Sequence, residues 1–121
     1  MMQDQPAINT GKDILFLLTG GWDSDDGEAR LCFDSCMVEG ALLLNPHWAE
    51  AVTIVRVEAA RPRAEIIALL DDDNQNAPTL LLATDTAAHE AVEILGERRF
   101  LTDPRLICRQ LAEAYGGSRP N

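Results

Sequence analysis

Residues 77–83 read Ala77-Pro78-Thr79-Leu80-Leu81-Leu82-Ala83. A near-continuous apolar run of this length is typical of a strand that is buried on both faces, and proline is tolerated at the first position of a strand. Short apolar runs of the same kind occupy residues 13–19 and 51–57. Their length and β-branched or leucine-rich composition favour strands over helices. We therefore predict three buried strands.

Helices are expected between and after these strands, each marked by a start or stop signal in the sequence. The predicted helices cover residues 32–44, 61–70 and 103–115. Asn45-Pro46 stops the first helix, and Pro62 suits the first turn of the second. Asp103 is expected as the N-cap of the last helix, which Gly116-Gly117 ends.

The other segments complete the predicted order. Residues 20–30 are expected to form a loop, and residues 98–101 a fourth strand. Residues 84–96 are ambiguous, and a hairpin excursion with a short helix at 88–95 is one reading of them. The order β-α-β-α-β-β-α implies parallel pairing early and a hairpin late. The expected core residues are Ile14, Phe16, Leu18, Leu43, Ile54, Val55, Ile67, Leu80, Leu82, Ile107 and Leu111.

Length and charge exclude several classes of protein. The 121 residues suit one domain, here residues 13–117, with residues 1–12 as a flexible leader and 118–121 as a tail. Twenty acidic against ten basic residues give a net charge of −10, which disfavours nucleic acids and membrane surfaces as partners. No apolar run is long enough for a membrane span, and no secretory signal is visible. Three cysteines cannot all pair, which favours a reducing, cytoplasmic location.

Three segments together resemble a known fold. They are residues 77–82, residues 101–107 (Leu101-Thr102-Asp103-Pro104-Arg105-Leu106-Ile107), and the stretch from Cys32 to Gly40 after the first strand. The first two resemble the N-terminal domain of glutathione transferases, and the first also resembles the glutaredoxins. Their combination with the third segment, Arg61-Pro62-Arg63 and Asn74-Gln75 resembles an uncharacterised bacterial family of unknown function that is regarded as thioredoxin-like. The resemblance implies a three-layer thioredoxin-like α/β fold with a four-stranded mixed sheet in the order 4-3-1-2. It also implies a cis peptide before Pro78, against the start of the cysteine-bearing helix.

The candidate catalytic residues lie in Cys32-Phe33-Asp34-Ser35-Cys36. From Cys32 the pattern is C-x-x-S, as in monothiol glutaredoxins, with Cys36 one position later. Unpaired N–H groups and the positive end of the helix dipole stabilise a thiolate at such a helix start, whereas the many neighbouring carboxylates oppose it. Cys32 would be the nucleophile and Ser35 a hydrogen-bond donor to it. The alternative is that Cys32 is a small buried apolar residue, and a Cys32–Cys36 disulfide is left open.

The resemblance also implies a substrate groove at Ala77, Pro78 and Asp103. Transferases carry a Glu-Ser pair at the start of the last helix, where this chain has Asp103 and Pro104. Proline supplies neither a hydroxyl nor an amide hydrogen, so glutathione is expected to bind weakly. The chain is also too short for a complete transferase. No metal is expected, because His47 and His89 have no partner at ligand spacing and the acidic loop at 23–27 does not fit an EF-hand.

Two functions from different classes remain. Ser35 and Pro104 each replace a functional group of a better-known relative, which favours a non-catalytic or weakly thiol-active binding module. The alternative is a thiol-dependent, glutaredoxin-like or glutathione-linked oxidoreductase that uses Cys32. The expected partner is a peptide or protein thiol, with no resident cofactor, no nucleic acid and no membrane. The sequence does not decide between a monomer and a homodimer.

Overall fold

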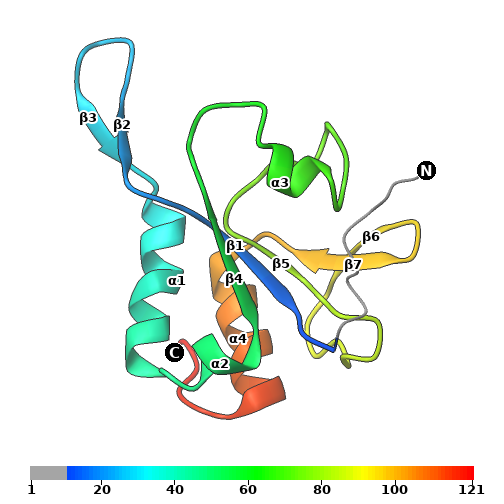
Figure 1. The fold of residues 1–121 in the computed structure, drawn as a ribbon. Helices are drawn as coiled ribbons and strands as arrows, with labels where there is room; N and C mark the ends of the chain where they lie inside the picture. The colour runs from blue at the N-terminus through cyan, green and yellow to red at the C-terminus, as the bar shows by residue number, and fades with distance from the viewer. Residues whose placement is uncertain (1–10) are drawn as a thin grey trace.

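The computed structural model describes residues 11–121, so most of the predicted leader at 1–12 lies outside the described residues. These residues form a mixed α/β protein with one five-stranded sheet, a separate two-stranded hairpin and four helices, and Figure 1 shows their arrangement. The strands are β1 (Ile14–Leu18), β2 (Gly21–Asp23), β3 (Ala29–Leu31), β4 (Thr53–Val57), β5 (Thr79–Leu81), β6 (Glu93–Leu95) and β7 (Arg98–Leu101). The helices are α1 (Phe33–Leu44), α2 (Trp48–Ala51), α3 (Ala64–Ile67) and α4 (Pro104–Tyr115).

The strands of the main sheet lie in the order β4-β1-β5-β7-β6. Strand β1 pairs in parallel with β4 and antiparallel with β5, and the pairs β5–β7 and β6–β7 are also antiparallel. All four predicted strands are present, and the mixed α/β class is confirmed. The sheet has five strands instead of the expected four because β6 adds an edge.

Strand β6 replaces the short helix considered at residues 88–95, and that helix prediction was wrong. Leu95 pairs with Arg98 across a two-residue turn in which Gly96 has a φ of +62°. A positive φ at the first turn residue matches the twist of a tight hairpin, and glycine adopts it without a steric penalty. The local turn therefore decides the structure of this segment.

The loop predicted at residues 20–30 is a β-hairpin. Strands β2 and β3 pair from Gly21↔Leu31 to Asp23↔Ala29, and every residue of both strands is exposed. Figure 1 shows the hairpin standing away from the main sheet. Because neither face of the hairpin is buried, its sequence is acidic and lacks the alternation of apolar and polar residues that would have predicted two strands.

The helices differ from prediction in length and in orientation. Helix α1 starts directly after Cys32, as expected, but it buries Ser35, Val38 and Leu42. Leu43, predicted in the core, is 82% exposed. The residue next to a buried Leu42 is turned away by about 100° on a helix, which explains this error.

The predicted helix at 61–70 is mostly irregular. Helix α3 has four residues, and the Arg61–Pro62 peptide that precedes it is cis, so Pro62 lies outside the helix. The short helix α2 was not predicted, and it replaces the first residue of the strand expected at 51–57. Helix α4 begins after the Asp103 N-cap and ends at Gly116, as predicted.

Helices cover the sheet on both faces. Alternate residues of β1 point to opposite sides, and Leu15 and Leu17 join a cluster that includes residues of α1, α2 and α4. Phe16 and Leu18 join the cluster on the other side, which includes Ile66 of α3. In the described range, 11–121, no helix combines the length and the apolar character that crossing a bilayer requires.

A buried carboxylate ties the ends of the domain together. Asp13 is 0% exposed. It accepts hydrogen bonds from the Ala83 amide (2.7 Å), the Thr86 hydroxyl (2.8 Å) and the Tyr115 hydroxyl (2.7 Å). Burial, followed by the bond to Asp13, raises the pKa of Tyr115 far above its ordinary value. The last residue of α4 is thereby joined to the residue that precedes β1.

Candidate functional site

Cys32 lies at the junction between the hairpin and helix α1. It is the N-cap of α1, with an extended backbone, and its Sγ accepts a hydrogen bond from the Ser35 amide at 3.3 Å. The Cys32 carbonyl accepts the next bond, from the Cys36 amide at 3.0 Å. The thiol therefore has the position of a capping side chain, which contacts one of the N–H groups that a helix start leaves unpaired.

The second part of the site comes from the segment before β5. The Ala77–Pro78 peptide is cis, which confirms the sequence-based expectation, and Pro78 is buried. The Cys32 thiol donates to the Ala77 carbonyl with a sulfur–oxygen distance of 3.7 Å, across 45 positions of the chain. Cys32 and Ala77, which are far apart in the sequence, are thus direct neighbours.

Ser35 acts differently from the sequence-based expectation. Its side chain is buried, and its hydroxyl oxygen accepts a hydrogen bond from the Leu18 amide at 3.0 Å. The donor to Cys32 is the Ser35 backbone amide and not the hydroxyl. The hydroxyl therefore fastens the first turn of α1 to the end of β1, and any amino acid except proline could supply the donor to sulfur.

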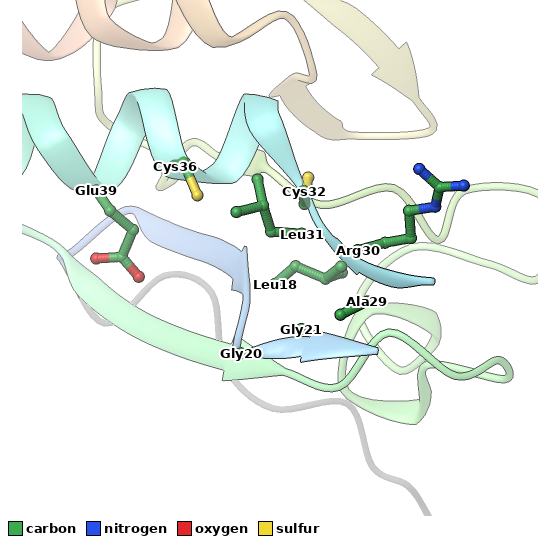
Figure 2. Close-up of a pocket in the computed structure, with 9 residues that line it drawn as sticks. All are labelled: Leu18, Gly20, Gly21, Ala29, Arg30, Leu31, Cys32, Cys36 and Glu39. Carbon is green, nitrogen blue, oxygen red and sulfur yellow. The ribbon is translucent and has the colours of Figure 1, made fainter. Parts of the chain in front are cut away.

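A cleft of about 480 Å³ opens beside Cys32. Its lining residues are Leu18, Gly20, Gly21, Ala29, Arg30, Leu31, Cys32, Cys36 and Glu39. Figure 2 shows the two cysteines on the α1 side of this cleft and Gly21 and Ala29 on the strands of the hairpin. Both thiols are free, and Cys36 is exposed. The volume suits a small molecule or part of a peptide.

Both charged residues of the cleft are engaged by partners. The Arg56 guanidinium donates two hydrogen bonds of 2.8 Å to the Glu39 carboxylate, and these bonds hold the pKa of Glu39 below its ordinary value. Arg30 is paired with Asp26 in the hairpin at 2.8 Å. The remaining lining is largely apolar, so a neutral ligand meets little unpaired charge there.

Arg63 is a residue near the site that sequence analysis missed. Its guanidinium donates to the carbonyl oxygens of Ala59 and Gln75, both at 2.8 Å, and so joins the loop before α3 to the segment before Pro78. Burial lowers the pKa of Arg63, the Arg61 charge lowers it further, and the Cys32 sulfur acts in the opposite direction. Arg63 therefore fixes the loop before α3 to the segment that leads into Pro78, and an arginine after a proline was too weak a signal to find this role.

Asp103 is not part of this arrangement. Its carboxylate accepts hydrogen bonds from the Arg105 and Leu106 amides at 2.9 and 3.1 Å, as an N-cap does, and it does not line the cleft beside Cys32. Of the six predicted site residues, Cys32 and Cys36 line the cleft, Ser35 and Ala77 contact Cys32, Pro78 follows Ala77, and Asp103 caps α4. Within residues 11–121 no group of three or more His, Cys, Asp or Glu side chains is arranged to hold a metal ion.

Comparison with known proteins identifies the family. A family model described as "Protein of unknown function (DUF3088)" matches residues 12–119. The chain belongs to the DUF3088 family. No curated protein and no solved structure matches this DUF3088 chain. The family gives no activity, so the function has to be argued from the site.

Proposed function

We propose that this DUF3088 chain is a thioredoxin-like binding module that takes up a thiol- or disulfide-containing ligand beside Cys32 and exchanges with it weakly. The observation that carries the proposal is the position of the Cys32 sulfur, between the Ser35 amide and the Ala77 carbonyl at the edge of the cleft. Support for the thioredoxin-like topology comes from the order β4-β1-β5-β7 and from the cis proline beside the cysteine that starts α1.

The proposed chemistry is one thiol–disulfide exchange. The Cys32 thiolate attacks one sulfur of a disulfide ligand and forms a new S–S bond to it. The S–S bond of the ligand breaks, and the second sulfur leaves as a thiolate with the electron pair. One disulfide is lost and one is gained, so the step needs no external oxidant or reductant. The Ser35 amide would donate to the attacking thiolate, and the Ala77 backbone would lie alongside an extended ligand.

A purely non-catalytic module is the second candidate. The position three residues after Cys32, where a dithiol protein has its resolving cysteine, holds Ser35, whose hydroxyl accepts from Leu18. Because serine holds that position, release of the mixed disulfide depends on Cys36, one position later, or on an outside thiol, which favours capture over turnover.

The test is covalent capture with a small neutral disulfide, 2-hydroxyethyl disulfide, followed by intact-mass and peptide analysis. The Cys36→Ser variant should form the mixed disulfide at Cys32 as fast as the unmodified protein. The Cys32→Ser variant should lose the fast phase, although its exposed Cys36 still reacts slowly. Adducts found on Cys36 alone in the unmodified protein would overturn the proposal and leave the non-catalytic reading.

A further inference from the structure

Helix α1 carries an apolar stripe that the described residues cover only in part, and its residues from Met37 to Leu44 border a groove towards α4 and residues 118–120. Phe33, Met37 and Leu44 are 72%, 38% and 79% exposed. Together with Gly40 they follow the spacing i, i+4, i+7, i+11, which places them in one line along the helix. We call these four residues the α1 stripe. It contains no charge, although the protein carries a net charge of −10, and contiguous exposed apolar surface of this kind marks interaction sites.

No contact within the described chain explains why residue 40 is a glycine. A Cβ at this position would meet no atom within 4 Å, and the residue has ordinary helical backbone geometry. Glycine in the middle of a helix costs about 0.5–1 kcal/mol relative to alanine. Because the domain itself leaves room for a side chain here, the space above Gly40 is available to another molecule that approaches the helix closely.

We propose that the α1 stripe is a two-fold interface with a second copy of this chain, in which the two α1 helices pack antiparallel. The stripe is complementary to itself in that arrangement. A two-fold axis midway between Phe33 and Leu44 brings Phe33 opposite Leu44 of the second copy, and Met37 opposite Gly40 of the second copy. The longest flexible side chain of the stripe then enters the space over the glycine, and each pairing occurs twice, as an isologous interface requires.

The charges beside the stripe are also complementary under this axis. The exposed Asp34 lies at the start of α1, whereas Arg119, which is paired with Glu113 of α4, lines the groove next to Leu44, near the end of the helix. The antiparallel arrangement brings Asp34 of each copy to the level of residue 43 of the other, close to that arginine. Opposite charges at the rim fix the direction of packing more than they add affinity.

The size of the surface sets the expected strength. A stable interface usually buries about 1,600 Å² in total. One face of a 12-residue helix with its flanking groove offers less than this. We therefore expect a reversible dimer with a dissociation constant on the order of micromolar, which tightens with added salt because salt screens the repulsion between two acidic copies.

Adjacent leucines provide a matched pair for sedimentation experiments. Leu44 lies on the stripe and Leu43 does not, but their exposures of 79% and 82% are nearly equal. Leu44→Arg should raise the dissociation constant at least about tenfold, the effect of losing one important contact, while Leu43→Arg should leave it nearly unchanged. Gly40→Gln should also weaken the dimer and yet stabilise the helix. Equal effects of the two leucine variants, or a monomer at every concentration, would overturn the proposal and point to a different apolar partner.

Disulfide trapping tests the antiparallel direction, in a background with Cys32, Cys36 and Cys108 replaced by alanine. The two copies of Met37→Cys would be about 4.5 Å apart along the helix axis, and those of Phe33→Cys about 16 Å apart, from the rise of 1.5 Å per residue. Met37→Cys should therefore cross-link to itself, and Phe33→Cys should cross-link to Leu44→Cys in a mixture. Self-cross-linking of Phe33→Cys with no product in the mixture would overturn the antiparallel arrangement.

Discussion

The hydroxyl of Ser35 accepts a hydrogen bond of 3.0 Å from the amide of Leu18. Leu18 is the last residue of β1, and Ser35 belongs to the first turn of α1, so the bond spans the whole inserted hairpin. It fixes the start of the helix that holds Cys32 relative to strand β1 of the main sheet. The Ser35 side chain, which was expected to donate to the Cys32 thiol, therefore holds in place the helix turn that carries this thiol.

Ser35→Ala should lower the free energy of unfolding by about 1–3 kcal/mol, because it leaves a buried amide without an acceptor. Urea denaturation should show a lower midpoint with an unchanged slope. Ser118→Ala is the control, since Ser118 is exposed and uses its backbone amide in its bond to Asn45. A loss below about 0.5 kcal/mol in Ser35→Ala, the usual range of surface substitutions, would contradict this prediction.

Cys36 and Cys108 should differ in their rates of alkylation. Burial raises the pKa of Cys108, which is 5% exposed, whereas Cys36 is exposed. Iodoacetamide should modify Cys36 in the native protein and leave Cys108 intact until denaturant is added. Peptide mass spectrometry over time would measure this, and modification of native Cys108 at the rate of Cys36 would show that the interface between α1 and α4 opens readily.

Tyr115→Phe should cost about 1.5–3 kcal/mol, because Asp13 loses a hydrogen bond within a site that water does not reach. The pKa of Tyr115 is raised, so its contribution to stability is complete below the ordinary value of 10 and is lost as the pH rises beyond it. The stability difference between the two proteins should therefore shrink in alkaline solution. Tyr115 is the one tyrosine in the sequence, so tyrosinate absorbance reports on it directly. Ionisation of Tyr115 near pH 10 in the folded protein would refute this account.

The Glu39–Arg56 pair should contribute a small acid-dependent stability. Arg56 lowers the pKa of Glu39, so the contribution is present above the ordinary value of 4.5 and is lost as the pH falls below it. Glu39→Gln should remove that part of the acid dependence and change stability at neutral pH only slightly, since both side chains are partly exposed. Thermal melts from pH 3 to 7 would measure both effects. Parallel curves for the two proteins would contradict the prediction.

Glutathione should bind with a dissociation constant in the millimolar range or weaker. The Asp103 carboxylate is occupied by two helix amides, and Pro104 cannot donate. The loss of a hydrogen bond to a charged group weakens binding roughly 10- to 150-fold. Isothermal titration calorimetry is the measurement. Micromolar affinity that disappears in Cys32→Ala would favour the glutathione-linked alternative instead.

The elements that the sequence predicted well are those whose signals are local and strong. Apolar runs marked three of the four predicted strands, and Asp103-Pro104 marked the start of α4. The predictions were wrong where tertiary contacts, or the rotation of a helix about its own axis, determine which residues are buried. The exposed hairpin has no buried face to create a pattern, and no local feature distinguishes buried Leu42 from exposed Leu43.

The candidate site was predictable to a similar extent. The residues Cys32, Ser35, Cys36, Ala77 and Pro78 could be selected because the resemblance joined two distant segments, and Cys32 contacts Ala77 in the structure. The guanidinium of Arg63 and the bonds of the Asp13 carboxylate to residues 83, 86 and 115 could not be found in this way. These contacts depend on loops whose path only the folded chain defines.

The β2–β3 hairpin also has a consequence for motion. All six of its strand residues are exposed, and its two ends join β1 and Cys32. It can therefore open without disturbing the sheet, and its amides should exchange with solvent deuterium by local fluctuation while those of β1 exchange only through global unfolding. Each opening of the hairpin would widen the cleft beside Cys32 on one side. Ligand entry and amide exchange in the hairpin should therefore occur at the same rate.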